Sequence, residues 1–252
     1  TDVNGNFTIP NIQPGTYEVL EVLAGGYVPT LPATTFNGLP DPVLSVTVVS
    51  KTSNSPALLF GNKAARDYGD LPELAAGVPT GYHTTIANNG PSHGILPGFM
   101  LGQRQDAETN GIPSGTAQGD DNNPTGGLSD EDGLVSLNLV QGQPGAITLR
   151  VTNSGYASGY IQAWIDFNQN GSFADAGDHI LKNYIPVNGI NSNIPFAVPA
   201  NVAPGVTYAR IRYSYDYNLD PDGPAKAGEV EDYQFTVFSS LPIARNDRFP
   251  EQ

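Results

Sequence analysis

The sequence has no cysteine, so disulfides, thiolate metal sites and thiol nucleophiles are all excluded. Basic residues are scarce: 11 lysines and arginines stand against 25 aspartates and glutamates, which gives a net charge of −14. Because such an acidic surface repels phosphate groups, we expect no nucleic-acid binding. No apolar run approaches the roughly 18 residues that a membrane helix needs, so we expect no membrane insertion.

Glycine and proline are abundant, with 29 and 22 copies, and they separate short runs rich in Val, Ile, Tyr, Phe and Thr. This arrangement is typical of strands joined by tight turns, and it leaves little room for helix. We therefore predict an all-β protein. A length of 252 residues suits one large domain and a smaller or partial one.

Apolar and polar residues alternate in several segments, as in half-buried strands. Before Gly133 this pattern occurs at residues 44–48, and a run that is nearly filled by apolar residues, 17–23, is also predicted to be a strand. We predict no strand between 61 and 133. After Gly133 we predict strands at 135–139, 147–152, 161–167, 209–215 and 233–237. Strands at this spacing, with turn signals between them, indicate a β-sandwich. Trp164 falls on the face opposite Ile161, and we predict that it is a core residue rather than a sugar-binding platform.

The first segment carries a recognisable pattern, Asp2-x-x-Gly5-x-Phe7-x-Ile9-x-x-Ile12-x-Pro14-Gly15-x-Tyr17-x-Val19-x-Glu21. It resembles the second half of a Cna B-type (SdrD B-like) module. The resemblance implies a small β-sandwich that serves as a stalk in bacterial surface adhesins. In many such modules a Lys and an Asn are joined by an isopeptide bond, assisted by an acid at the position of Glu21. No lysine precedes Glu21 here, so we do not predict this bond within the chain and interpret Glu21 as an edge-strand carboxylate.

A stretch from Gln105 to Leu149 has no lysine or arginine but many acidic residues. They are Asp106, Glu108, Asp120, Asp121, Asp130, Glu131 and Asp132. Carboxylates packed this densely repel one another, so the segment either stays solvated or surrounds a hard cation. Ca²⁺ takes six to eight oxygen ligands, and we predict a calcium site here.

Two further groups are candidate cation ligands. Glu229, Glu231 and Asp232 come directly before the strand predicted at Tyr233, where they would either bind a cation or form a charged turn. A second group fits the first half of the calcium loop D-x-[DN]-x-[DN]-G. Its residues are Asp166, Asn168, Asn170 and Asp178, with Gly171 at the turn. Since Gly177 holds the twelfth place and Asp178 comes one residue late, a hairpin turn capped by asparagine side chains is the alternative.

Several of these acidic pieces occur in an order that resembles the GEVED domain of bacterial secreted and surface proteins. The pieces are Asp67-Tyr68-Gly69-Asp70, Leu101-Gly102 with Asp106-Ala107-Glu108, Gly119-Asp120-Asp121 with Ser129-Asp130-Glu131-Asp132-Gly133, and Gly228-Glu229-Val230-Glu231-Asp232-Tyr233. The resemblance implies an extracellular β-sandwich of about this size, but it carries no catalytic activity or ligand. The three histidines lie far apart in sequence without metal-hydrolase spacing, so we expect no enzyme.

These observations predict a partial Cna B-like module at 1–60, a GEVED-like sandwich at 61–240 and, at 241–252, a linker or the start of an Ig-like repeat. The expected function is that of a calcium-stabilised structural or adhesive module, located extracellularly at the cell surface or in the matrix. Its expected partners are neighbouring domains, cell-surface or matrix glycans, or copies of the same protein linked by strand complementation into a fibre. The alternative is a carbohydrate-binding accessory module of a secreted enzyme, which needs exposed aromatics near Trp164. A hydrolase would need a cleft in which His83 or His93 meets a carboxylate.

Overall fold

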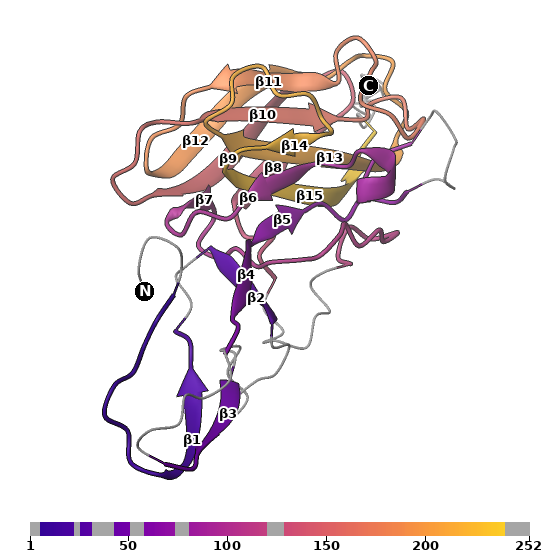
Figure 1. The fold of residues 1–252 in the computed structure, drawn as a ribbon. Coiled ribbons are helices and arrows are strands. Elements are labelled where there is room, and N and C mark those ends of the chain that lie inside the picture. Colours follow the sequence, from indigo (N-terminus) through magenta and orange to yellow (C-terminus); the bar gives the residue numbers. More distant parts are fainter. Residues whose placement is uncertain are drawn as a thin grey trace, which may run out of the picture. The chain divides into compact units, whose positions relative to one another are not determined.

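The computed structural model describes residues 6–22, 26–31, 43–50, 58–73, 81–119 and 129–239 (Figure 1). The chain divides into two compact units, residues 1–65 and 66–252. Apart from one short 3-10 turn (Ile86–Asn88), the regular elements of the described parts are strands, which confirms the all-β prediction. Within these parts, no helix has the length and apolar character needed to cross a membrane.

The first unit contains two antiparallel strand pairs. Strands β1 (Gly15–Leu20) and β3 (Val43–Val48) form one pair, and β2 (Tyr27–Leu31) and β4 (Gly61–Ala64) form the other. Because β4 pairs with β2, residues 61–65 belong to this unit rather than to the next one.

Tyr17 lies opposite Val46 on the apolar face of the β1–β3 pair, whereas Thr16 and Thr47 meet on the polar face with their hydroxyl oxygens 3.1 Å apart. The alternation predicted at residues 44–48 is therefore present. The described part of this unit buries little apolar surface, since of its apolar side chains Val46 and Ala65 alone are fully buried.

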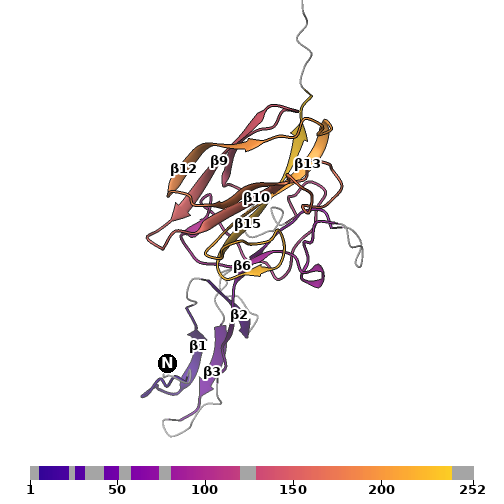
Figure 2. The same ribbon diagram turned by 90° about the horizontal axis from the view of Figure 1, so that it is seen from above.

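The second unit is built on two antiparallel sheets. One sheet has the order β11-β10-β13-β15, and the other has the order β12-β9-β7 with β8 also paired to β9. The strands are β7 (Phe99–Leu101), β8 (Leu134–Asn138), β9 (Pro144–Asn153), β10 (Tyr160–Ile165), β11 (His179–Tyr184), β12 (Gly189–Ala197), β13 (Gly205–Ser214) and β15 (Gly228–Val237). Figure 2 shows β9 and β12 in one layer and β10, β13 and β15 in the other.

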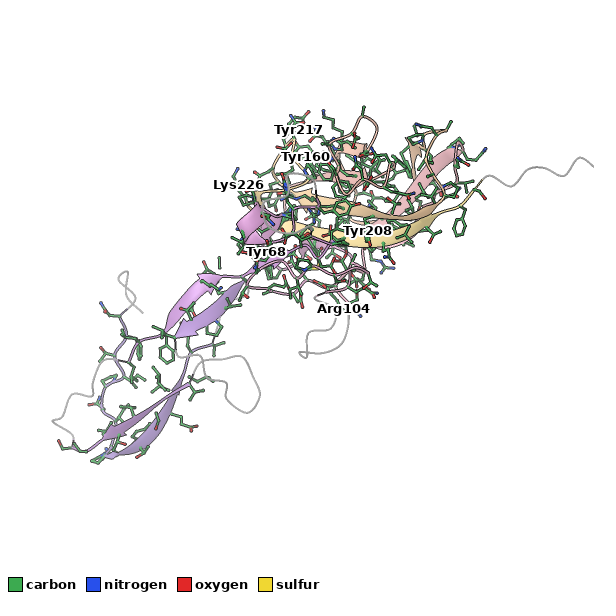
Figure 3. All side chains as sticks on the ribbon, turned by 90° about the vertical axis from the view of Figure 1, so that its right-hand side faces the viewer. Tyr68, Arg104, Tyr160, Tyr208, Tyr217 and Lys226 are labelled. Atoms are coloured by element: carbon green, nitrogen blue, oxygen red, sulfur yellow. The ribbon has the colours of Figure 1, made fainter. Side chains whose placement is uncertain are left out.

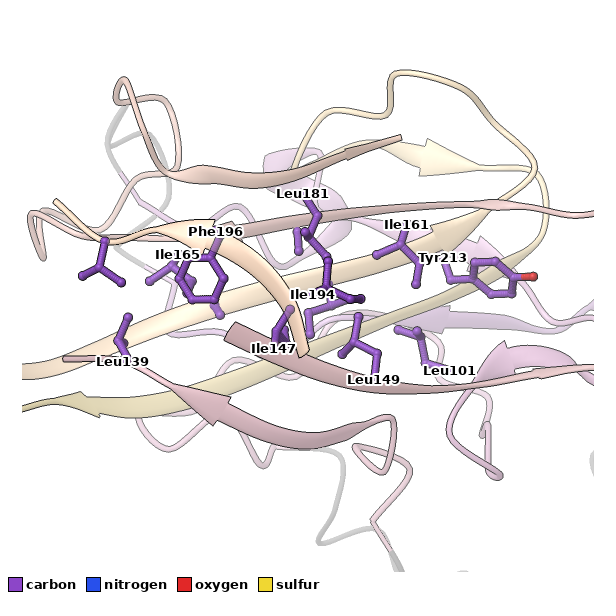
Figure 4. Packing of buried hydrophobic residues seen from close by; sticks show 14 of the residues in the cluster. Leu101, Leu139, Ile147, Leu149, Ile161, Ile165, Leu181, Ile194, Phe196 and Tyr213 are labelled. Atoms are coloured by element: carbon purple, nitrogen blue, oxygen red, sulfur yellow. The ribbon is translucent and has the colours of Figure 1, made fainter. Parts of the chain in front are cut away.

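The hydrophobic core lies between these two sheets. Ile161, Ile165 and Leu181 project from one sheet, and Ile147 and Leu149 project from the other (Figure 4). The predicted sandwich is present, because each strand turns its alternate apolar residues toward this layer.

The opposite face of the β10–β13–β15 sheet is also covered. Trp164, 2% exposed, packs there with Leu71, Tyr82, Ala117 and Phe173, so its prediction as a core residue is confirmed. The cover comes from the part of the second unit that precedes β8, which carries Leu71, Tyr82 and Ala117. Two strands of this part, β5 and β6, form a small sheet of order β14-β6-β5 with a strand from the loop between β13 and β15. Its strands are β5 (Arg66–Tyr68), β6 (Ser92–Gly94) and β14 (Pro224–Ala225).

The prediction of no strand between residues 61 and 133 is wrong, since β4, β5, β6 and β7 all lie there. Each of these strands has only three or four residues. A period of two residues cannot be recognised over so short a run, and the pairing of these strands depends on partners distant in sequence.

The core packing predicts a large effect of one substitution. Leu149→Ala should lower the free energy of unfolding by about 2–5 kcal/mol, because Leu149 is fully buried between the sheets. Val187→Ala is the control, since Val187 is 64% exposed and its loss should cost less than about 0.5 kcal/mol. Urea unfolding measures both. Equal effects would contradict the packing of the two sheets.

Candidate metal centre

We call residues 69–133, which lie between β5 and β8, the long connection. Three carboxylates from two segments of this connection come together. Asp106, Glu108 and Asp130 each offer one oxygen, and these oxygens lie within 4.8 Å of one another. The backbone holds them there: the N–H of Glu108 donates to the carbonyl of Arg66 at 3.0 Å, and the N–H of Asp106 donates to Oδ2 of Asp130 at 3.3 Å. The structure thus brings together three of the predicted metal ligands.

Glu229 on β15 is a fourth acidic side chain of this region. It is 1% exposed, and neither of its carboxylate oxygens has a hydrogen-bond partner among the described residues. Burial raises the pKa of its carboxyl well above the ordinary value, and the charges of Glu231, Asp67 and Asp130 add to the rise. The backbone amide of Leu101 lies near enough to oppose this rise, but it does not form a hydrogen bond of normal geometry with Glu229. A buried carboxylate in this state must keep its proton or meet a cation.

The side chain of Gln105 connects the two parts of this group, because its Nε2 donates to the carbonyl of Gly228. Residues 105–108 are therefore fixed beside the start of β15. We call Asp106, Glu108, Asp130 and Glu229 the acidic centre.

Unlike the carboxylate of Glu229, those of Glu231 and Glu131 accept hydrogen bonds from other groups of the protein. The carboxylate of Glu231 accepts from the N–H of Gly133 at 2.7 Å and from the hydroxyl of Tyr233 at 2.8 Å. Burial raises the pKa of its carboxyl to about 8. Glu131 accepts from the N–H of Asp232 at 3.0 Å. These two glutamates tie the segment at 131–133 to β15 by direct contacts.

Asp232 forms a buried ion pair with Arg210. The Nε and Nη2 atoms of Arg210 donate to the two carboxylate oxygens at 2.8 and 2.9 Å, and the two side chains are 1% and 0% exposed. Oδ2 also accepts from the N–H groups of Asp70 at 2.8 Å and Leu71 at 3.1 Å. Asp232 is thus occupied by protein donors on the outer side of the sheet.

The expectation that Glu229, Glu231 and Asp232 precede the last strand is wrong, because β15 begins at Gly228, which pairs with Ser214. In this strand Glu229 and Glu231 lie on one face of the sheet and Asp232 lies on the other. Sequence reasoning also left Asp67 out of the site, although it noted the motif that contains it. Asp67 is buried, and its Oδ2 accepts from the N–H of Val230 at 2.7 Å.

The arrangement of acidic residues along β15 agrees with the comparison to known families. Residues 160–236 match the GEVED domain. The match runs from β10 into β15, and it includes Glu229 and Asp232 but not Asp106 or Asp130. Searches of curated proteins and of solved structures gave no match.

Other predicted ligands of the GEVED region lie elsewhere. Asp132 accepts from the N–H of Gln103 at 2.7 Å and from Nη1 of Arg104 at 3.0 Å. Asp120 and Asp121 lie outside the described residues. Asp166 is fully buried, and it accepts from the hydroxyl of Tyr82 at 2.5 Å.

Two histidines bear on the catalytic alternative. His93 is fully buried, and its Nε2 accepts from Nε of Arg212 at 2.9 Å. Burial and the charge of Arg212 lower its pKa well below the ordinary value, so His93 is a neutral side chain of the protein interior. His83 does meet a carboxylate, with Nδ1 2.5 Å from Oδ2 of Asp222, and both side chains are partly exposed. That the chain is not an enzyme stays a prediction.

The buried carboxyl of Glu231 predicts a pH dependence in the presence of chelator. The pKa of its carboxyl rises from the ordinary glutamate value of 4.5 to about 8 in the folded protein, so between these pH values the unfolded chain releases a proton that the folded chain keeps. The contribution of this carboxyl to the free energy of unfolding is therefore fully present below about pH 4.5, and it is lost as the pH rises toward 8.

The variant Glu231→Gln should remove this loss, because it cannot ionise. The difference in unfolding free energy between wild type and variant should then fall steadily from pH 5 to pH 8. Glu18→Gln, on the exposed face of β1, is the matched control. Parallel curves for wild type and Glu231→Gln would contradict the raised pKa.

Proposed function

We propose that this chain is a structural, adhesive module of a bacterial cell-surface or matrix protein, stabilised by Ca²⁺ bound at the acidic centre. The observation that carries the proposal is Glu229, a buried carboxylate without a hydrogen-bond partner among the described residues, close to the charge of Asp130. The GEVED domain, a module typical of extracellular proteins, supports the location.

The chemistry of the four side chains favours calcium. All offer oxygen, with no nitrogen or sulfur among them, and hard cations prefer such ligands. Zn²⁺ would favour histidine and cysteine. Ca²⁺ also accepts irregular geometry and a high coordination number, which suits ligands from three separate segments, whereas Mg²⁺ requires near-octahedral order.

A cation at this place would have a structural role. Asp106 and Glu108 belong to the long connection, Asp130 precedes β8, and Glu229 lies near the start of β15, the edge strand of its sheet. One ion would cross-link these segments in a protein that has no disulfides. Its removal would leave the clustered carboxylates of Asp106, Glu108 and Asp130, and the nearby Glu229, without a compensating charge.

Calcium should therefore raise the free energy of unfolding relative to chelator, by about 2.7 kcal/mol when the ion is present at 100 times its Kd. Glu229→Gln should reduce this gain and should stabilise the metal-free protein at neutral pH, because it removes a buried ionisable group. Glu18→Gln should leave the gain unchanged. Thermal unfolding with Ca²⁺, Mg²⁺ or chelator measures each case, and an equal calcium gain in wild type and Glu229→Gln would refute this centre.

The first unit supports a role in a stalk or fibre. Its resemblance to a Cna B-type module is joined by one contact at the position of Glu21, whose Oε1 accepts from Nδ2 of Asn62 at 3.0 Å. Val22 and Leu59 are largely exposed, and each described sheet of this unit has two strands. Open edges and apolar surface of this kind favour the addition of a strand.

We propose that residues 241–249 of a neighbouring copy supply this strand. Such a contact is head-to-tail, so it would propagate into a ring or filament. The full chain should then assemble with rising concentration, and a chain ending at Ser240 should not, as measured by size exclusion with light scattering. A monomeric full chain, or equal assembly of both chains, would remove the proposal.

The carbohydrate-binding alternative has less support. Trp164 is buried and stacks on His179 with ring centroids 4.6 Å apart, so it cannot serve as a sugar platform. Exposed aromatic side chains are present in the described residues, and one of them is Tyr217, 63% exposed, which lies edge-on to Tyr160 with ring centroids 5.2 Å apart (Figure 3).

A further inference from the structure

The loop from Asp166 to Asp178, between β10 and β11, contains oxygen ligands that the acidic centre does not use. Asp166, Asn168 and Asn170 occupy alternate positions before Gly171, which is the spacing by which calcium loops direct successive side chains to one ion. The backbone has positive φ at Gln169 (59°) and at Gly171 (81°), so the chain curls tightly at these two places.

This curl brings the side-chain oxygens to the same short stretch of backbone. Asp166 accepts from the N–H groups of Asn170 at 3.2 Å and Gly171 at 2.8 Å. Asn168 Oδ1 accepts from the N–H of Asn170 at 3.2 Å, and Asn170 Oδ1 accepts from the N–H of Ser172 at 2.9 Å. Oδ2 of Asp166 also accepts from the hydroxyl of Tyr82, so it has two donors. Oδ1 of Asp166, Oδ1 of Asn168 and Oδ1 of Asn170 each accept one of these bonds and keep a second lone pair.

Asp178 provides the independent observation that points to a ligand. It is 2% exposed, Oδ1 accepts from the N–H of Phe167 at 3.2 Å, and Oδ2 is buried with no hydrogen-bond partner among the described residues. Its carboxylate therefore lies against the first turn of the loop. Burial raises the pKa of this carboxyl to about 6, and the charges of Asp166 and Asp175 contribute, so these acids face one another.

We propose that this loop binds a second calcium-type cation, through Asp166, Asn168, Asn170 and Asp178. The ligand set is again oxygen only, which favours a hard cation. Asn170 is oriented for this role, because its Nδ2 donates to Oδ2 of Asp175 at 2.8 Å and its Oδ1 is thereby directed away from that carboxylate. The site shares no residue with the acidic centre, and it does not depend on that centre being occupied.

The departure from the usual calcium loop has a structural explanation. Gly177 stands at the twelfth position, where a glutamate would normally bind. Its φ of 105° reverses the chain, and the carboxylate of the next residue, Asp178, returns to Phe167 at the start of the loop. Asp178 can thus replace the twelfth ligand although it comes one residue later.

The position of the loop offers a specific spectroscopic test. Phe173, within the loop, packs in one cluster with Tyr82 and with Trp164, the single tryptophan of the chain. Tb³⁺ has the same preference for oxygen ligands as Ca²⁺ and becomes luminescent when a nearby aromatic ring transfers its excitation energy. Terbium in this loop should be sensitised by excitation of Trp164.

The experiment uses the full chain as wild type, Asp178→Asn, Asn168→Ala and Glu229→Gln, with Glu18→Gln as the charge-matched control. Tryptophan-sensitised terbium luminescence gives the affinity of the loop, and equilibrium dialysis with Ca²⁺ gives the number of bound ions. Asp178→Asn should weaken loop binding on the order of tenfold or more, because one charged ligand is lost. Asn168→Ala, a change at an exposed position, should weaken it without affecting folding.

Glu229→Gln and Glu18→Gln should keep the sensitised luminescence at the wild-type level. If Asp178→Asn and Asn168→Ala both bind terbium and calcium as the wild type does, the loop is closed by its own hydrogen bonds and the proposal is wrong. Loss of calcium stabilisation in Glu229→Gln with unchanged luminescence would support the two sites separately. The opposite result, in which Asp178→Asn loses luminescence and Glu229→Gln behaves as wild type, would support the loop and refute the acidic centre.

Discussion

The buried ion pair between Arg210 and Asp232 is the contact on which the outer layer of the larger unit depends. It joins neighbouring strands β13 and β15, and its remaining hydrogen-bonding capacity holds the long connection. Asp232 accepts from the amides of Asp70 and Leu71, and Nη1 of Arg210 donates to the carbonyl of His83 at 2.8 Å. A buried pair of charges is costly unless such additional bonds satisfy it. Here they are supplied by the polypeptide that covers it.

Arg212, two residues further along β13, is a second buried arginine whose side chain is satisfied by the surrounding polypeptide. Its donors reach His93 and the carbonyls of Asp220, Asp222 and Gly223. No carboxylate pairs with it directly among these contacts, and burial lowers the pKa of its guanidinium to about 9. The pair of Arg210 and Asp232 therefore helps to explain how a connection rich in Gly, Asp and Pro can be ordered, because its backbone amides and carbonyls are the partners of buried charges. Arg212 does the same for the loop between β13 and β15.

The same unit contains carboxylates of two kinds. Glu231 and Asp232 have protein donors, whereas Glu229 and the second oxygen of Asp178 have none among the described residues. This contrast separates structural acids from candidate cation ligands, although both kinds belong to the same acidic motifs in sequence. In a protein without cysteine, cations at the second kind would provide the cross-links that disulfides provide in many extracellular domains.

The sequence by itself determined five strands of the sandwich, namely β8, β9, β10, β13 and β15, together with the burial of Trp164 and the acidic character of the connection. Strands β11 and β12 were not predicted, because the apolar residues of β11 are adjacent and the pairing of β12 shifts register between Asn191 and Ile194. Each of the features that the sequence determined follows from local pattern: an alternation of five or more residues identifies a strand and its buried face wherever the strand lies. The tertiary structure decided which acids meet. Loop closure brings Asp130 beside Asp106 and Glu108, and Asp67 is buried where its Oδ2 accepts from the N–H of Val230, far away in sequence. The three-residue strands were likewise invisible in the sequence, because their hydrogen-bond partners, and not their own residues, make them strands.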